Sequence, residues 1–145
     1  MARRENKTLP TDADVGAFIE AVPNKGRRED ARLLLDMMRR VTGEEPVMWG
    51  PSIVGFGETT YAFADGGEGR APGLAFSPRS NRMVLYLPLS RPEVQEKLPR
   101  LGPHDTGVTC LYLKRLDKLD LGVLEEIVTA SKPKAGGGGA AAAGG

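Results

Sequence analysis

The sequence predicts an α+β domain with two N-terminal helices, a curved antiparallel sheet of about five strands and two further helices. Apolar residues recur at helical spacing up to residue 41. From residue 52 onward they gather in short β-type runs that Gly, Pro, Asn and Asp separate. Two later segments begin with residues that cap helices. The length of 145 residues suits a single domain.

The first predicted helix follows a polar, basic arm formed by residues 1–9. Thr11 is the expected N-cap, and Asp12 and Asp14 fall in the first turn, where carboxylates favour the helix dipole. The Pro-Asn pair at 23–24 ends this helix. Its buried face is expected to hold Val15, Phe18, Ile19 and Val22.

A second helix is predicted over residues 27–41, with Gly43 as its stop signal. Its buried stripe is expected to hold Ala31, Leu34, Leu35, Met38 and Val41. The arginines of this segment are interpreted as a solvated face, because the net charge of the chain is only +1. They are Arg27, Arg28, Arg32, Arg39 and Arg40.

The middle of the chain predicts an antiparallel meander. The pair at 57–58 is expected to be a tight turn, residues 64–73 a Gly-rich loop, and residues 77–81 a further turn. The strand candidates are Ser52–Phe56, Thr60–Ala64, Gly73–Ser77, Met83–Leu87 and residues 107–115.

Two shorter helices follow the meander. Ser90 and Glu93 have the spacing of a capping box, with Pro92 in the first turn, and Gly102 ends that helix. Asp120 is the expected cap of the last helix. The inward residues are expected to be Val94, Leu98 and Leu101 in the earlier helix, and Leu121, Leu124, Ile127 and Val128 in the later one.

Composition narrows the class of protein. We expect a single domain over 10–131 and a low-complexity Gly/Ala tail over 132–145. The near-neutral charge argues against a nucleic-acid partner, and no apolar run approaches the length of a membrane span. Cys110 is the only cysteine, which excludes an intramolecular disulfide framework. We therefore expect a cytoplasmic protein.

The sequence holds no recognisable set of catalytic residues. GPSIVG at 50–55 is not the Gly-x-Ser-x-Gly nucleophile elbow, and the Gly-rich segment at 64–73 matches neither phosphate-binding motif. Metal chemistry is weakly signalled, because His104 and Asp105 are neighbours and Cys110 follows six positions after the histidine. Iron is left open as a cofactor, because carboxylates could bind it or another hard cation.

Recognition of a small ligand or anion on the sheet is the favoured interpretation. Tyrosine and tryptophan carry polar tips that suit a pocket rim, although ordinary core packing is the alternative for them. Arg79, at a turn, has the guanidinium that binds carboxylate or phosphate. The candidate ligand-binding residues are Trp49, Tyr61, Arg79, Tyr86, His104, Thr106 and Cys110.

Trp49, the only tryptophan, precedes a Gly-Pro corner. Pro51 disfavours a helical Gly50 and predicts an extended entry to the next strand. Trp49 is therefore expected at a corner between the second helix and the sheet, either as a plug of the core or as one wall of a shallow pocket.

VMWGPSIVGFG at 47–57, AFSPRS at 75–80 and TGVTCLYLKRL at 106–116, taken together, resemble the YdhG-like family of bacterial domains, over about residues 7–131. The resemblance implies an α+β fold. It also implies the alternative function of a frataxin-like iron chaperone, since one branch of the family is described in that way. Partners would then be a small molecule or a metal ion, and a homodimer is a further interaction to test.

The sequence departs from the family pattern in two places. A basic pair usually follows FSP, whereas this chain has Arg79 and Ser80. The loop before the last strand usually carries lysines, whereas this chain has Pro103 and Asp105 on either side of His104. If the family binds an anion through those lysines, this chain is expected to bind it more weakly or to bind something else.

Overall fold

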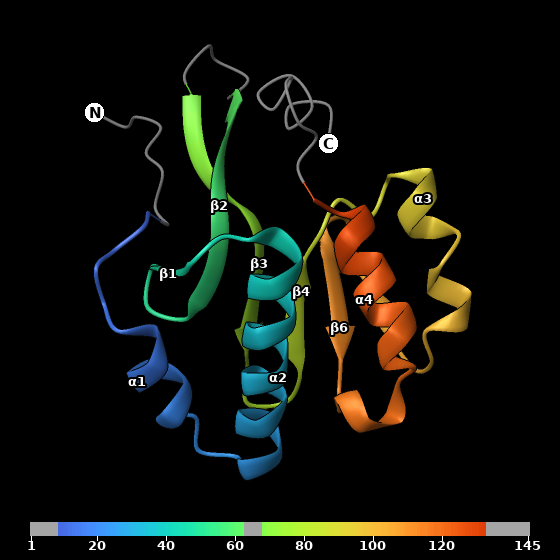
Figure 1. Cartoon of the computed structure of the whole chain (residues 1–145), viewed down its shortest axis with the longest axis horizontal. Coiled ribbons are helices and arrows are strands. Elements are labelled where there is room, and N and C mark those ends of the chain that lie inside the picture. The colour runs from blue at the N-terminus through green and yellow to red at the C-terminus, as the bar shows by residue number, and fades with distance from the viewer. Residues whose placement is uncertain (1–8, 63–67, 133–145) are drawn as a thin grey trace.

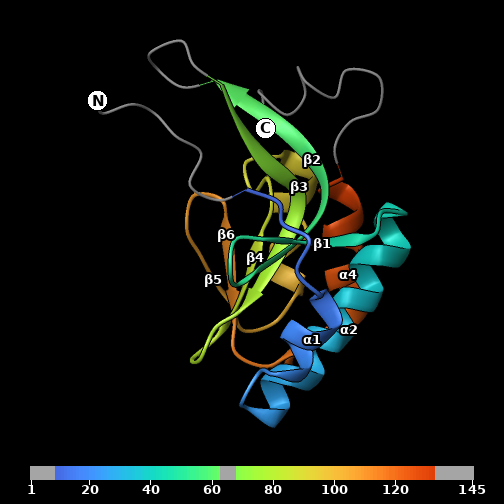
Figure 2. The ribbon, with the colours of Figure 1, turned by 90° about the vertical axis from the view of Figure 1, so that its left-hand side faces the viewer.

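A computed structural model describes residues 9–62 and 68–132 of the chain. One antiparallel sheet of six strands, in the order β1-β2-β3-β4-β6-β5, carries α2 and α4 against one face (Figures 1 and 2). The predicted α+β class is therefore confirmed. The elements are α1 (Val15–Glu20), α2 (Lys25–Thr42), β1 (Pro46–Trp49), β2 (Ile53–Ala62), β3 (Glu68–Pro78), β4 (Met83–Tyr86), α3 (Pro92–Gln95), a 3-10 turn (Leu98–Arg100), β5 (Asp105–Thr106), β6 (Cys110–Leu113), a second 3-10 turn (Leu116–Lys118) and α4 (Leu121–Ala130).

The first helix begins later than the sequence predicts, and the second begins earlier. Asp14, rather than Thr11, caps α1, because its carboxylate accepts a hydrogen bond from the Ala17 amide at 2.9 Å. Asn24 caps α2 through the Arg27 amide at 2.8 Å. The Pro-Asn pair therefore starts the second helix as well as ending the first. The predicted stop is confirmed, since Gly43 has a left-handed φ of 72° at the C-cap of α2.

The interpretation of Arg27 as part of a solvated face is wrong. Arg27 is only 7% exposed and Asp30 only 4% exposed, both on the buried side of α2. The Asp30 carboxylate accepts hydrogen bonds from Arg115 Nε at 2.9 Å and from the Leu116 amide at 3.0 Å. These buried polar groups have hydrogen-bond partners in place of water, which is why they can lie at the base of the helical layer.

The sheet has longer central strands than predicted. The expected turn at Gly57-Glu58 is wrong, because both residues lie inside β2. Gly57 has a φ of 74°, so a glycine bends the strand there without reversing the chain. The expected loop at 64–73 falls partly outside the described residues, and its remainder belongs to β3. The meander of β2, β3 and β4 is confirmed, and the sequence missed β1 and β5 at the edges.

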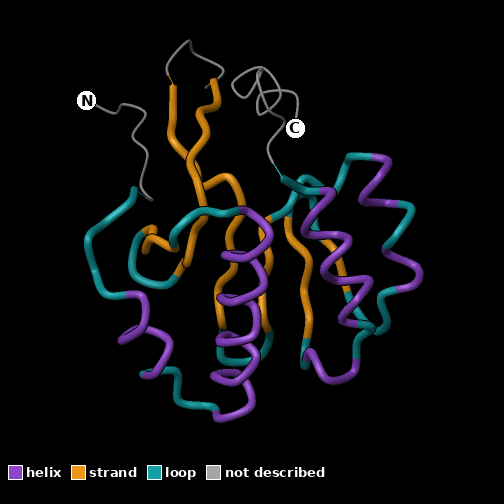
Figure 3. Tube along the Cα trace, viewed as in Figure 1, coloured by secondary structure: helices purple, strands orange, loops and turns teal. Residues whose placement is uncertain are grey.

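The β2–β3 pair reaches beyond the rest of the sheet (Figure 3). β1 pairs only with residues 53–56 of β2, and β4 pairs only with residues 75–78 of β3. The outer halves of β2 and β3 pair with each other, from Glu58↔Pro72 to Ala62↔Glu68. Glu58 and Arg70 form an ion pair across this ribbon.

The C-terminal helices keep their predicted places but differ at their ends. The capping box is absent, since Arg91 is the N-cap of α3 and forms no side-chain cap. Asp120 caps α4 as predicted, through the Val123 amide at 3.1 Å. Leu121, which the sequence predicts to face inward, is 37% exposed. Val123 is buried in the core instead.

Strand alternation divides the sheet into a core face and an open face. The core face packs against the helices through Phe56, Phe76, Met83, Leu85, Leu111 and Leu113, all buried. The open face carries the intervening residues, and none of the helices in the described ranges covers it (Figure 2). Polar side chains near this face can therefore meet a ligand.

No helix within residues 9–62 or 68–132 combines the length and the apolar character that a membrane span requires.

Candidate functional site

A hollow of about 310 Å³ lies on the open face, at the end of the sheet where β3 turns into β4. The strands β4 and β6 form its floor, and the turn at residues 79–82 forms its rim. Its lining residues are Arg79, Ser80, Asn81, Arg82, Val84, Tyr86, Cys110 and Tyr112.

The floor is a two-by-two grid set by strand register. Val84 lies opposite Tyr112 and Tyr86 opposite Cys110 in the antiparallel β4–β6 pair. Residues two apart share a face, so all four side chains project from the open side. The floor of the hollow therefore consists of one apolar side chain, that of Val84, two phenols and one thiol.

Arg79 is held at the rim by two hydrogen bonds. Its Nε donates to Ser77 Oγ at 2.8 Å and its Nη2 donates to the Tyr86 hydroxyl at 3.0 Å. Ser77 is buried and donates in turn to the Ser52 carbonyl at 2.6 Å. One edge of the guanidinium is thus occupied. Because the group has five N–H donors, the edge formed by Nη1 and the second N–H of Nη2 is left for a ligand.

Arg82 occupies the opposite side of the grid. Its guanidinium carbon lies 4.0 Å from the centre of the Tyr112 ring, within the range of a cation–π contact. The contact places a second positive charge over β6, while Arg79 lies over β4.

Neither rim arginine is neutralised by the described part of the chain. Among the side chains that the structure describes, in residues 9–59 and 69–132, no carboxylate lies within ion-pair distance of Arg79 or Arg82. Arg32, an exposed arginine on α2, differs in this respect, because it forms a 2.5 Å ion pair with Glu20. The hollow therefore presents two exposed cations, neither of which forms an ion pair with a described carboxylate.

The Tyr112 phenol has a perturbed acidity. A hydrogen bond with the Cys110 thiol and the charge of its thiolate raise the pKa of Tyr112, and the nearby Arg82 charge acts in the opposite direction. Gly107 faces this phenol, since a Cβ built there would lie 3.2 Å from the hydroxyl. The phenol is therefore a neutral donor at neutral pH.

Hydrogen bonds from α2 connect the rim turn to the helical layer. Arg27 Nε donates to the Arg79 carbonyl at 3.0 Å, and Arg27 Nη1 donates to the Lys114 carbonyl. The Arg79 amide also donates to the Arg82 carbonyl at 2.9 Å, closing the turn. Burial lowers the pKa of Arg27, with Asp30 opposing that shift. The buried Arg27 side chain thus fixes the position of the rim turn relative to α2.

The structure brings together three of the seven predicted ligand-binding residues, namely Arg79, Tyr86 and Cys110. Trp49 lies elsewhere on the open face, where its ring packs over Gly55 and is only 2% exposed. It is therefore a buried packing residue and does not line the hollow. The Gly50 entry is a left-handed turn with a φ of 66°, where the sequence predicts an extended one. The side chain of Tyr61 lies outside the described part of the chain.

The loop candidates lie apart from the hollow. Thr106 borders a different hollow of about 220 Å³, together with Leu98 and Val108. His104 Nδ1 lies 2.7 Å from the Gly102 carbonyl, so a local hydrogen bond orients its ring. Asp105 is opposite Tyr112 in the β5–β6 pair but does not line the hollow.

The metal candidates do not form a larger ligand group. In the ranges that the structure describes, no set of three or more His, Cys, Asp or Glu side chains lies close enough to hold one ion. His104 and Asp105 therefore stand as a pair.

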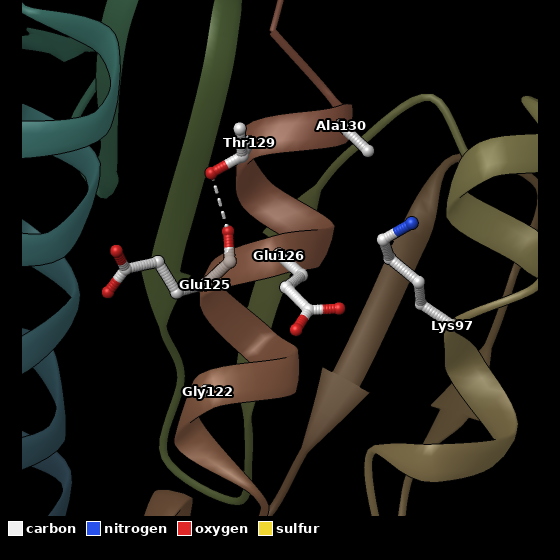
Figure 4. A pocket seen from close by; sticks show the side chains of 6 residues that line it. All are labelled: Lys97, Gly122, Glu125, Glu126, Thr129 and Ala130. Atoms are coloured by element: carbon white, nitrogen blue, oxygen red, sulfur yellow. Dashed lines mark hydrogen bonds between the residues drawn. The ribbon is translucent and has the colours of Figure 1, made fainter.

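A larger hollow of about 520 Å³ lies along α4, beside Lys97 (Figure 4). Its acids already have partners, since Glu125 pairs with Arg40 at 2.9 Å and Glu126 with Arg100 at 3.2 Å. The Thr129 hydroxyl donates to the Glu125 carbonyl at 2.8 Å. The charges of this hollow are balanced by the chain itself, which is why the open-face hollow is the stronger candidate.

Sequence reasoning missed Arg82 and Tyr112 as site residues. A signal was available for each: Tyr112 alternates with Leu111 and Leu113, and Arg82 closes the same short turn as Arg79. What the sequence lacked was the register that places β6 beside β4.

The chain matches no protein-family model, no curated protein and no solved structure.

Proposed function

We propose that this domain binds a small anionic molecule, a carboxylate or a phosphate, in the open-face hollow. The observation that carries the proposal is Arg79: two hydrogen bonds orient its guanidinium, one edge is left for a ligand, and no described carboxylate neutralises it. A planar guanidinium edge matches the two oxygens of such an anion.

The surroundings support an anion in two further ways. Arg82 adds a second positive charge, and the hydroxyls of Tyr86 and Tyr112 supply donors at the floor. The hollow is near the lower end of the volumes of small-molecule sites, so it suits a small ligand.

The groups that line the hollow support binding of an anion. The described lining contains no imidazole and no carboxylate, the groups that most often serve as general bases. An Arg–anion contact, by contrast, needs only the groups that are present.

Calorimetry and amide NMR shifts test the proposal directly. Titration with acetate and with inorganic phosphate should give saturable binding, with shifts gathered at residues 79–86 and 110–112. Arg79→Ala should weaken binding roughly tenfold or more, because a charge-assisted contact contributes about 1.5–3 kcal/mol. Arg32→Ala is the matched control, since it removes the same charge from an exposed pair on α2.

Two outcomes would overturn the proposal. One is the absence of saturable binding for every anion tested. The other is equal weakening by Arg79→Ala and Arg32→Ala, because that would show a general response to net charge in place of a site.

The alternative, an iron chaperone, rests on the resemblance to the YdhG-like family. His104 and Asp105 are its candidate ligands, and the open-face hollow is not part of it. The two functions are separable by experiment because their residues lie in different places.

A further inference from the structure

The two rim arginines lie over different strands of the grid, and this placement bears on the kind of anion that fits. Arg79 bonds to the phenol of Tyr86 on β4, and Arg82 lies over the ring of Tyr112 on β6. With Tyr86 opposite Cys110, the two tyrosines are diagonal neighbours, a relationship that separates them by roughly 7–8 Å.

The surface between the two arginines is short and offers no charged group that could pair with an anion. Val84 and Cys110 occupy the other diagonal of the grid, and Val84 is almost fully buried. A methylene chain can lie over this diagonal, whereas a second charge there would lose water without gaining a partner.

From this arrangement we infer that the ligand is a short dianion, with anionic groups at both ends of a small apolar linker, one held by Arg79 and the other by Arg82. The inference rests on the proposed anion-binding function and names its ligand class. A short dicarboxylate is the simplest molecule of this class.

Physical chemistry gives a clear expectation for such a ligand. Once one carboxylate is bound at Arg79, the other is held at high effective concentration near Arg82. The second contact is then gained without another loss of translational freedom. A ligand with one charged end lacks this gain.

Succinate and succinamate are the matched probes for this inference. They have nearly the same size and shape, and the second replaces one carboxylate by a neutral amide. Calorimetry on the full chain at constant ionic strength should show that succinate binds at least about tenfold more tightly than succinamate. Arg82→Gln should remove most of that difference, because it should weaken succinate binding far more than succinamate binding.

The control variant is Arg100→Gln, which removes an equal charge from the α4 side of the molecule. It should leave the ratio between the two probes unchanged. Arg82→Ala provides a second variant at the exposed rim, so the result does not depend on how glutamine packs there.

The outcomes separate this inference from the proposed function. If both probes bind with equal affinity in an Arg79-dependent manner, the anion site stands and the dianion inference is overturned. If succinate keeps its advantage in the Arg82 variants, the inference is also overturned. If neither probe binds, and acetate and phosphate also fail, the proposed function itself is overturned.

Discussion

Arg27 Nε lies 3.0 Å from the backbone carbonyl of Arg79, so a buried cation on α2 holds the residue that heads the candidate site. The two residues are 52 positions apart in the chain. The same guanidinium also reaches the Lys114 carbonyl at the end of β6. The rim turn and the last strand are therefore fixed to one helix by a single side chain.

Replacing Arg27 should both destabilise the fold and loosen the rim. Arg27→Met fills similar space but leaves two backbone carbonyls without their donor, which should cost about 2–3 kcal/mol in free energy of unfolding. Chemical denaturation measures that loss. Arg39→Met, which removes an exposed arginine from the same helix, should change stability by less than about 0.5 kcal/mol.

The Arg27 variant also tests the link to the site. Amide exchange at residues 79–82 should become faster in Arg27→Met than in Arg39→Met under conditions where both remain folded. Unchanged exchange at this turn would show that the rim holds its shape without Arg27.

Gly55 should tolerate no side chain. A Cβ at this position would lie 2.5 Å from Trp49 Cδ1 and 2.7 Å from Pro72 Cβ. Gly55→Ala should therefore displace the tryptophan ring, lower stability by about 1–3 kcal/mol and shift the tryptophan emission to longer wavelength. Gly16→Ala on α1 is the control, because only the Asp14 carboxylate approaches its new Cβ, at 3.3 Å.

The pKa of Tyr112 gives a pH-dependent prediction. Because its pKa is raised, the folded chain keeps this phenol neutral at a pH where an unfolded tyrosine, with a pKa of about 10, begins to ionise. Its contribution to stability is therefore complete below about pH 10 and is lost as the pH rises through the raised value. Absorbance at the tyrosinate band follows the titration.

Cys110→Ala identifies the cause of that shift. Removing the thiol should move the pKa of Tyr112 back toward its ordinary range, because the thiol is the first cause of the rise. Tyr112→Phe assigns the transition by abolishing it, with Tyr61 and Tyr86 still present. A Cys110→Ala titration identical to that of the parent chain would remove Cys110 as the cause.

Iron binding is tested separately at His104. If this chain is an iron chaperone, anaerobic calorimetry with ferrous iron should show saturable binding in the micromolar range, and the double variant His104→Ala, Asp105→Ala should weaken it. Arg79→Ala should leave the iron titration unchanged, because Arg79 carries no metal ligand. A flat titration of the parent chain with both ferrous and ferric iron contradicts this alternative.

The parts of the fold that follow local patterns were predictable. Helical spacing and the Gly43 stop signal predict α2, and the Asp120 cap predicts the start of α4. Strand alternation places Tyr86 with Val84 and Cys110 with Tyr112 on common faces, and these four residues form the floor of the hollow. Such patterns are local, so a single sequence contains them.

What the sequence did not predict depends on contacts far along the chain. Arginine is a surface residue in most settings, and burial of Arg27 becomes favourable through the carbonyls of Arg79 and Lys114 and the nearby charge of Asp30. Gly57 is a residue type common in turns. It nevertheless lies within β2, because its neighbours Phe56 and Glu58 both pair with β3. Trp49 is buried by its packing over Gly55, which no local pattern announces.

The division of β4 and β6 into two faces has a consequence for how this domain can change. Met83, Leu85, Leu111 and Leu113 point into the core, while Val84, Tyr86, Cys110 and Tyr112 alternate with them on the outside. The side chains that pack the core and those that line the hollow are therefore separate members of the same eight positions. A library that varies only the outward set and the exposed turn residues should yield new ligand preferences while most members still fold.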